Sequence, residues 1–303
     1  MKYSLGFIGL GMMGHGMASN LLRHGHDLRV MAHRQRANVD DLVAQGATEV
    51  NSRRDLCDGA DAIILCVTGT PQVEAIVLGE DGLLQAAQQG QVVIDCSTAE
   101  PGSTARIREA FVARGVAYVD APLARTPKEA AEGRLNTMVG ASEADFSRVQ
   151  PIMACFCENV IHVGPPGHGH VLKLINNMLA MTTAAAIAEA VATASKAGLS
   201  LQRFFEVVSA GGVNSGIFQM MVGKALQGDL SGLKFSIANG QKDLRYYTHL
   251  TESLPVVSHI AEAVHQSFVQ ASCMGYGDKF IPSLMEAQER INGVGIVPPP
   301  PDR

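Results

Sequence analysis

The sequence predicts an α/β domain with a doubly wound parallel sheet, followed by an all-helical domain. Its 303 residues are about twice the usual domain length of roughly 150 residues. Strand-like apolar runs alternate with helical segments through the first half. That order predicts parallel strands joined by right-handed crossovers. After Gly164 only helical segments follow, and no convincing strand is expected beyond Val163.

Composition narrows the class of protein. Hydrophobic residues make up 47 % of the chain and charged residues only 17 %, against about 25 % charged residues in a typical globular protein. We therefore expect a folded chain. The net charge of −5 argues against a nucleic-acid partner. Glycines interrupt the apolar N-terminus, which argues against a signal peptide.

The six cysteines indicate a reducing compartment. None forms a Cys-x-x-Cys pair, and Cys66 and Cys96 lie within apolar runs typical of buried free thiols. Cys155-x-Cys157 has no second pair at zinc spacing, so no metal site is expected there. We predict a cytoplasmic protein.

The first domain is expected to span residues 1–164. The alternation predicts strands at 4–9, 27–32, 62–67, 91–96, 117–120, 134–139 and 160–163. It predicts helices at 13–23, 39–45, 71–77, 102–114 and 142–153. Ser142 is expected to cap the last of these helices.

The second domain is expected to span residues 165–296, with a proline-rich tail at 297–303. Its first helix, 170–197, is apolar on almost every side and is therefore expected to be buried. Further helices are expected near 201–209, 217–223, 236–253, 255–274 and 281–292. The long helix carries Lys173, Asn176, Asn177 and Glu189, a set that argues against a membrane span.

A glycine-rich turn predicts a dinucleotide site. Gly9-Leu-Gly11-Met12-Met13-Gly14 follows a predicted strand and opens a predicted helix. In such a turn the first glycine permits the tight bend and the second lets the backbone approach a pyrophosphate. The third lets helix and strand pack closely. The helix N-terminus then presents free N–H groups to the phosphates.

The end of the second strand predicts which cofactor binds. NAD sites usually place an acid there for the ribose hydroxyl, but this chain continues His33-Arg34-Gln35-Arg36. Because a guanidinium suits a phosphate, we expect NADP(H) to be preferred, with NAD(H) possible, and His33 and Arg34 to lie beside the adenosine. The alternative is that the arginines are solvated surface residues.

Two further loops follow strands at the edge where such sheets bind ligands. They carry Val67 with Thr68 and Ser97 with Thr98. We assign Val67, Thr68 and Thr98 to the cofactor and Ser97 to the substrate. The alternative is that Ser97 or Thr98 only caps the helix that begins near Pro101.

Lys173 stands out on the long apolar helix. A buried ammonium costs free energy unless it is paired or functional. Burial can also lower the pKa of a lysine, which suits proton transfer near neutral pH. Asn177 lies one turn further on the same face and Asn176 beside it. The alternative is a lysine that extends to solvent along its stem.

Four segments together resemble the β-hydroxyacid dehydrogenase family, over about residues 4–292. The first is the glycine-rich turn through Ala18, and the second is Asp120-Ala-Pro-Leu-Ala-Arg125-Thr126. The others are Gly167-His-Gly169-His-Val-Leu-Lys173-Leu-Ile-Asn176-Asn177 and Lys242-Asp243-Leu244.

The resemblance implies a Rossmann domain, a helical C-terminal domain, and a homodimer or homotetramer formed through the long helix. It implies that Lys173 is the catalytic acid and base, that Asn177, with Asn176, orients the substrate, and that Lys242 lies beside the nicotinamide.

One segment departs from the family. The family commonly reads Asp-Ala-Pro-Val-Ser-Gly-Gly, and its Ser-Gly-Gly cradles a carboxylate. Here Arg125 and Thr126 replace the two glycines, which is similar to the sulfolactaldehyde reductases. Since a guanidinium binds carboxylates and sulfonates in two bonds, we expect Arg125 and Thr126 to bind an anionic substrate. The alternative is a surface arginine.

Together these features predict an NAD(P)-dependent oxidoreductase that interconverts a small anionic aldehyde, of the semialdehyde or sulfolactaldehyde type, and its hydroxyacid. We expect no metal, since His168 and His170 have no acids nearby. No membrane or nucleic-acid partner is expected. The alternatives are a non-catalytic NADP-binding regulator or scaffold, and an imine reductase, although such enzymes usually replace the lysine.

Overall fold

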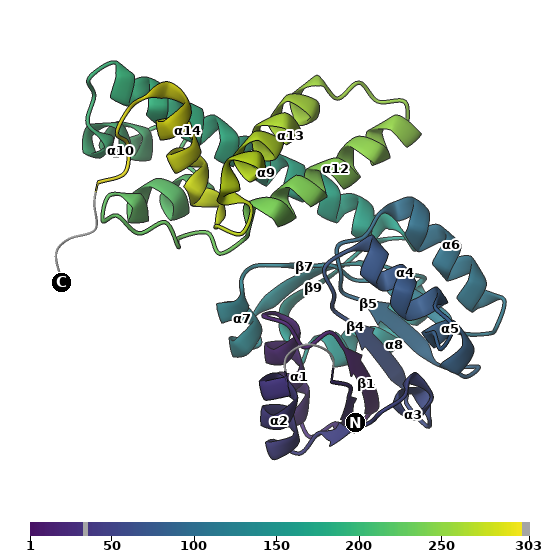
Figure 1. Ribbon diagram of the computed structural model, residues 1–303. Coiled ribbons are helices and arrows are strands. Elements are labelled where there is room, and N and C mark those ends of the chain that lie inside the picture. The colour runs from purple at the N-terminus through teal and green to yellow at the C-terminus, as the bar shows by residue number, and fades with distance from the viewer. Residues whose placement is uncertain (33–35, 299–303) are drawn as a thin grey trace. The chain divides into compact units, whose positions relative to one another are not determined.

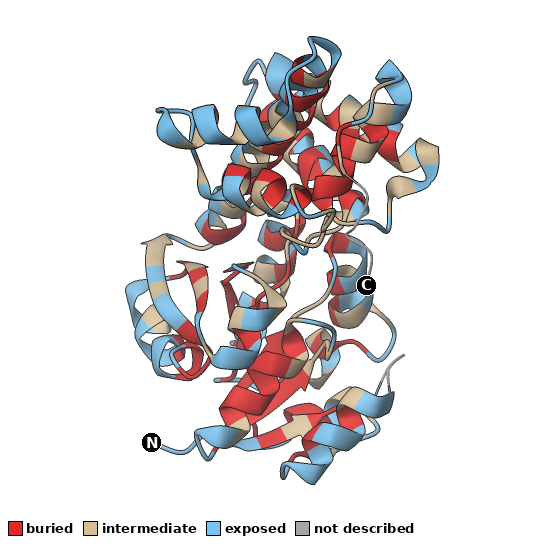
Figure 2. Ribbon diagram, turned by 90° about the vertical axis from the view of Figure 1, so that its left-hand side faces the viewer, coloured by how far each residue is buried: buried red, intermediate tan, exposed pale blue. Residues whose placement is uncertain are grey.

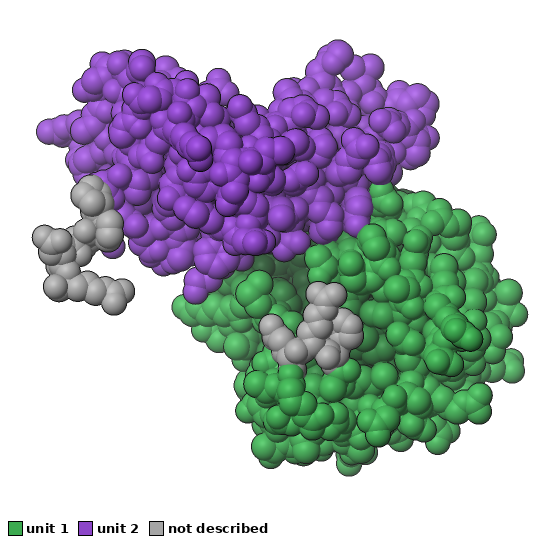
Figure 3. Space-filling model, in the orientation of Figure 1, with its two compact units in different colours: residues 1–173 green, residues 174–303 purple. Residues whose placement is uncertain are grey.

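The computed structural model describes residues 1–32 and 36–298. The chain forms two compact units, Met1–Lys173 and Leu174–Arg303 (Figure 3). The expected boundary at 164/165 differs from this division, which falls inside a continuous helix. Contacts of that helix's first turn with the preceding strands account for the difference, as described below.

The first unit is built on one twisted sheet (Figure 1). Six parallel strands lie in the order β3-β2-β1-β4-β5-β6. They are β1 (Ser4–Ile8), β2 (Asp27–Val30), β3 (Thr48–Glu49), β4 (Ala62–Leu65), β5 (Val92–Asp95) and β6 (Ala117–Asp120). The chain order reverses at β1, which lies between β2 and β4. The doubly wound fold predicted from the sequence is therefore confirmed.

Three strands extend this sheet. β8 (Leu135–Gly140) pairs antiparallel with β6 and with the short β7 (Leu123–Ala124). β9 (Cys157–Gly164) pairs parallel with β8. Arg125 and Thr126 lie directly after β7, between that strand and α7 (Pro127–Glu132).

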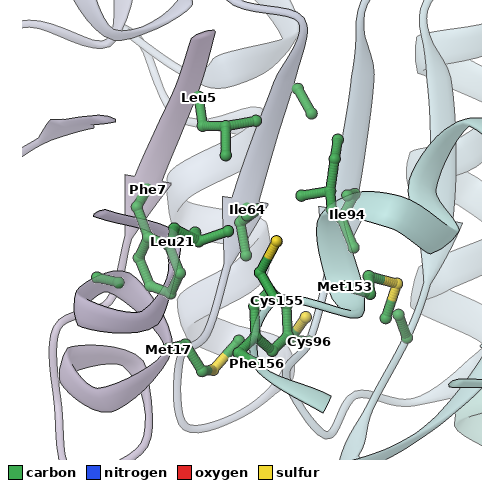
Figure 4. Packing of buried hydrophobic residues seen from close by; sticks show 14 of the residues in the cluster. Leu5, Phe7, Met17, Leu21, Ile64, Ile94, Cys96, Met153, Cys155 and Phe156 are labelled. Atoms are coloured by element: carbon green, nitrogen blue, oxygen red, sulfur yellow. The ribbon is translucent and has the colours of Figure 1, made fainter. Parts of the chain in front are cut away.

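Helices cover both faces of the sheet. One buried cluster joins strand residues such as Phe7 and Ile64 to helices α1 (Gly14–Arg23), α2 (Arg36–Ala44) and α8 (Glu143–Met153), and Figure 4 shows its centre. A second cluster joins Ile63 and Leu65 to the other face, formed by α3 (Arg53–Cys57), α4 (Thr70–Leu78), α5 (Leu83–Ala86) and α6 (Pro101–Val112). Because strand side chains alternate between faces, β4 and β5 are buried throughout (Figure 2).

The second unit is helical. It contains most of α9 (His168–Lys196), then α10 (Leu201–Ala210), α11 (Gly216–Phe218), η1 (Gln219–Gly223), α12 (Ile237–Ser253), α13 (His259–Ala271), η2 (Ser272–Tyr276), η3 (Ile281–Ser283) and α14 (Leu284–Asn292). Within residues 174–298 no strand is present beyond one isolated bridge, between Ser236 and Phe280. Met181 and Ala184 of α9 pack with Phe268 and Met285 in its core.

The expectation that the long helix is buried on all sides is wrong for the single chain. Leu172, Ile175 and Leu179 of α9 expose 38 %, 39 % and 60 % of their surface. Its most apolar 18-residue window has a mean hydropathy of 1.4, enough by length and composition to cross a membrane. One side of the helix nevertheless packs into the core of the second unit. The exposed apolar residues lie on its other side.

The N-caps of α8 and α6 test two predictions, namely that Ser142 caps the first of these helices and that Ser97 or Thr98 caps the second. Ser142 caps α8 as predicted, since its hydroxyl accepts the N–H of Asp145. The N-cap of α6 is Glu100, without a side-chain bond. Ser97 and Thr98 therefore do not cap that helix, and the alternative reading of these two residues is wrong.

Candidate functional site

The glycine-rich turn joins β1 to α1 with the geometry of a phosphate cradle. Gly9 has a φ of +102°, and a Cβ there would lie 2.1 Å from the carbonyl oxygen of Cys66. A Cβ at Gly14 would lie 1.9 Å from the oxygen of Gly9. Around Gly11, in contrast, nothing lies within 4 Å of such an atom. The turn is thus closed on the protein side and open where a ligand would approach.

The start of α1 is suited to anions. Its N-cap, Met13, makes no side-chain capping bond, and Met12 is 71 % exposed. Free N–H groups at a helix N-terminus bind phosphate oxygens. Since β1 is also the switch point of the sheet, the residues present fit a dinucleotide pyrophosphate.

The adenosine side is only partly described. His33 and Arg34 lie outside the described residues. Arg36 binds Glu49 through both terminal nitrogens, at 2.6 and 2.8 Å, and Asp40 through Nε at 2.8 Å. The donors of the Arg36 guanidinium are thus engaged by these two carboxylates. The expected NADP(H) preference therefore depends on Arg34.

Ser97 connects the two loops at the ends of β4 and β5. Its hydroxyl accepts the N–H of Val67 at 3.1 Å, and its own N–H donates to Asp95 at 2.9 Å. Ser97 is buried, Val67 and Thr98 are partly buried, and Thr68 is exposed. The structure thus brings Val67 and Ser97 into direct contact.

Asp120 is a residue that the sequence reasoning did not assign to the site. This fully buried carboxylate accepts the N–H of Gly167 at 2.7 Å and that of His170 at 2.9 Å. It therefore holds the first turn of α9, where the helix dipole favours a negative charge. A Cβ at Gly140 or Gly169 would lie 2.7 or 2.8 Å from this carboxylate. Both positions therefore require a residue without a side chain.

The signal that could have revealed Asp120 is its register. Asp120 pairs with Asp95 across β5 and β6, so two acids end neighbouring parallel strands. Both are fully buried. Tyr118 donates to Asp95 at 2.7 Å, and burial together with the charge of Asp95 raises the pKa of Tyr118 well above its ordinary value. The phenol is thus a neutral donor.

His170 is buried between three elements. Its Nδ1 lies 2.7 Å from the Thr104 hydroxyl on α6, and its Nε2 lies 3.2 Å from the carbonyl oxygen of Ser97. Both ring nitrogens face protein groups. His170 therefore links α9 to the loop that carries Ser97.

Lys173 lies one turn after His170 and is partly buried. Its Nζ donates to the carbonyl oxygen of Leu123 at 2.6 Å. This contact places the ammonium beside the loop that departs from the family pattern. The structure thus brings Lys173 and the segment 123–126 together within the first unit.

Arg125 takes a backbone conformation usual for glycine, with a φ of +83°. Its Nη1 donates to the carboxylate of Glu158 on β9 and to the carbonyl oxygen of Arg134. The side chain is 30 % exposed. It is therefore an anchored arginine rather than a freely solvated one.

Thr126 caps α7. Its hydroxyl donates to Glu129 at 2.5 Å and accepts the N–H of Lys128, while its own N–H donates to Glu129 at 3.0 Å. These bonds with Thr126 lower the pKa of the Glu129 carboxyl. The polar groups of Thr126 are thus engaged in a capping box.

The remaining site residues belong to the second unit. Asn177 is buried and donates to Asp243 at 2.6 Å, and Lys242 binds the same carboxylate at 2.6 Å. The Lys242 ammonium lies 4.8 Å from the ring centre of Tyr246. Asp243, which sequence reasoning did not assign a role, therefore joins Asn177 to Lys242. Asn176 is exposed and donates to Asn177.

Comparison with known proteins gives matches over both units. Residues 4–164 match the model described as the NAD binding domain of 6-phosphogluconate dehydrogenase. Residues 167–284 match the model described as NAD-binding of NADP-dependent 3-hydroxyisobutyrate dehydrogenase.

Curated relatives align over nearly the whole chain. 2-(Hydroxymethyl)glutarate dehydrogenase of Eubacterium barkeri is 32 % identical, covering 96 % of this chain and 97 % of its own. 3-Sulfolactaldehyde reductase of Escherichia coli is 32 % identical, covering 93 % and 95 %. The crystal structure of a 3-hydroxyisobutyrate dehydrogenase from Salmonella typhimurium has a TM-score of 0.83 at 29 % identity, covering 94 % and 99 %.

Proposed function

Because the chain belongs to the β-hydroxyacid dehydrogenase family, which includes 3-hydroxyisobutyrate dehydrogenase, we propose that it interconverts a small anionic aldehyde and the corresponding hydroxyacid. The observation that carries the proposal is the contact of the Lys173 ammonium with Leu123, two residues from the Arg125 guanidinium. The proposed proton donor, on α9, thereby contacts the short segment that carries the proposed anion-binding cation.

The glycine-rich turn would hold the pyrophosphate of a nicotinamide cofactor, through Gly11, Met12, Met13 and the N-terminus of α1. The cofactor, when bound, supplies or accepts the hydride. Val67, Thr68, Thr98 and Lys242 would line its nicotinamide half. We propose NADP(H) as the preferred form, with Arg34 the arginine that binds the 2′-phosphate.

Lys173 is the proton donor of the reduction. As negative charge develops on the aldehyde oxygen, the ammonium stabilises that charge and then donates its proton. In the opposite direction the neutral amine accepts the hydroxyl proton. The carbonyl oxygen of Leu123 orients Nζ at 2.6 Å, and Asn177, one helical turn further along α9, orients the substrate.

Arg125 binds the anionic end of the substrate. Thr126 acts through the loop, because its hydroxyl and N–H are engaged with Glu129. Ser97 binds the substrate from the end of β5. The sulfonate of 3-sulfolactaldehyde, named in the Escherichia coli relative, is an anion that a guanidinium can bind in two bonds.

We further propose that a second copy of the chain covers the apolar side of α9, giving a homodimer or homotetramer. Leu172, Ile175 and Leu179 are three large apolar residues exposed on one helix, and such patches mark interaction sites. All six cysteines are free thiols, which supports a cytoplasmic setting.

The test is NADPH oxidation with a panel of short semialdehydes and 3-sulfolactaldehyde. We expect turnover by the wild type and a kcat lower by about 10²- to 10⁴-fold in Lys173→Ala, the usual range for a lost general acid. Lys196→Ala on the same helix, whose ammonium donates to Asn292, serves as the control. Unchanged kcat in Lys173→Ala would refute the proton-transfer role, and cofactor binding without turnover would favour a regulator.

A further inference from the structure

Glu158 binds the guanidinium of Arg125, the group proposed above to hold the anionic end of the substrate. It stands on strand β9, 33 residues from Arg125 in the sequence, and its carboxylate binds Nη1 of the Arg125 guanidinium. No motif of the sequence identifies it. The pair is accessible to water, since the two side chains are 30 % and 47 % exposed. Such a pair can exchange partners.

Several bonds hold Arg125 in this arrangement. Its left-handed backbone, with a φ of +83°, is disfavoured for a residue with a Cβ. Nη1 also donates to the backbone carbonyl oxygen of Arg134, which follows α7. Strand β9 and the end of α7 thus fix the direction of the guanidinium.

The loop offers few other donors to an anion. The hydroxyl and N–H of Thr126 are engaged with Glu129. Lys173, which contacts Leu123, is assigned to the reacting oxygen. Nη2 of Arg125 makes no hydrogen bond within residues 1–32 and 36–298. An anionic group would therefore bind at Nη2, beside the carboxylate of Glu158.

We propose that Glu158 is a specificity-determining residue that competes with the anionic group of the substrate for Arg125. The inference rests on the proposed function, because it takes Arg125 as the group that binds the anion. Glu158 neutralises the guanidinium before the substrate arrives and repels the incoming anion. It thereby weakens binding of anionic ligands, while neutral aldehydes are unaffected.

The experiment compares Glu158→Gln with Glu132→Gln, which removes a nearby acid that contacts Arg134 rather than Arg125. Succinate, an unreactive anion, is titrated by calorimetry into the full-length protein saturated with NADP+. Removing one like charge should tighten its Kd by about 3- to 10-fold in Glu158→Gln. Glu132→Gln should leave the Kd unchanged.

The kinetic arm uses two aldehydes that differ in charge. The KM of succinic semialdehyde should fall by a similar factor in Glu158→Gln, with the KM of butanal unchanged. Glu158→Asp keeps the charge but withdraws it by one methylene, so its values should lie between those of the wild type and Glu158→Gln. An unchanged or weaker Kd for succinate in Glu158→Gln overturns the inference.

Arg125→Gln separates this inference from the proposed function. If it weakens succinate binding while Glu158→Gln does not tighten it, only the competition fails. If Arg125→Gln leaves the Kd of succinate unchanged, Arg125 does not bind the anion, and that part of the proposed function fails as well.

Discussion

The carboxylate of Asp120 accepts the backbone N–H of His170 at 2.9 Å and so fastens the first turn of α9 to the end of β6. The same carboxylate accepts the N–H of Gly167. Lys173 follows His170 by one turn, and its ammonium contacts Leu123, which follows β6. Strand β6 and its loop thus position both ends of the segment that carries the proposed proton donor.

Asp120→Asn should lower both stability and activity. An amide in place of the carboxylate turns one N–H2 group toward a buried backbone N–H, which costs about 1–3 kcal/mol. The displaced helix turn should also lower kcat, by about 10-fold or more, because misplaced catalytic groups lose rate steeply. Urea denaturation and kcat at saturating cofactor measure the two effects.

Asp61→Asn is the matched control for Asp120. Asp61 also accepts a backbone N–H, that of Ser4 at 2.8 Å, but it is exposed. Water can replace that bond, so we expect stability and kcat close to the wild type. A wild-type kcat in Asp120→Asn would show that the position of α9 does not depend on this carboxylate.

Asp243→Asn should reduce kcat/KM. Asp243 is buried and joins the amide of Asn177 to the ammonium of Lys242. An amide at this position can accept from only one of these two donors and removes the charge that faces the Lys242 ammonium, so we expect a fall of about 10- to 100-fold. Asp229→Asn removes a partly exposed acid that faces Lys224 at 3.5 Å and should have little effect on kcat/KM. Equal kinetics for the two variants would argue against a positioning role for Asp243.

Cofactor preference should respond to Arg34 and not to Arg36. Removing a guanidinium from the 2′-phosphate should raise the KM of NADPH by about 10-fold or more in Arg34→Ala, with the KM of NADH nearly unchanged. Arg36→Ala removes a guanidinium that two carboxylates already hold. Its ratio of NADPH to NADH kcat/KM should stay that of the wild type. A clear NADH preference in the wild type would refute the assignment.

Local patterns were sufficient to predict the glycine-rich turn and the long helix. Gly9 and Gly14 are close in the sequence and pack directly against each other. The need for glycine at both positions therefore follows from their spacing alone. The apolar run of α9 also predicts a helix. Its burial could not be predicted, because which side is packed depends on residues such as Phe268, far away in the sequence.

Contacts between distant segments account for what the sequence did not reveal. The partners Asp120 and His170 are 50 residues apart, and Arg125 and Glu158 are 33 apart. A single sequence contains no periodicity that links them. Elements such as β3 and α7, with two and six residues, are also too short for a periodic signal.

Stability should fall below neutral pH because of His26. Its Nδ1 accepts the N–H of Tyr3 at 3.2 Å, so the neutral ring donates from Nε2 to the thiol of Cys155. Burial lowers the pKa of His26 below that of the unfolded chain, about 6.5. Its contribution is therefore present above pH 6.5 and is lost as the pH falls from there through the lower pKa of the folded state.

His26→Gln should flatten this dependence. The urea midpoint of the wild type should fall between pH 7.5 and pH 5.5, and the variant should lose less of its midpoint over the same interval, because glutamine takes up no proton. Part of the slope should persist, since burial also lowers the pKa of His265. His259→Gln, at an exposed position, should retain the wild-type slope. If His26→Gln and His259→Gln gave the same slope, protonation of His26 would not be what destabilises the fold in acid.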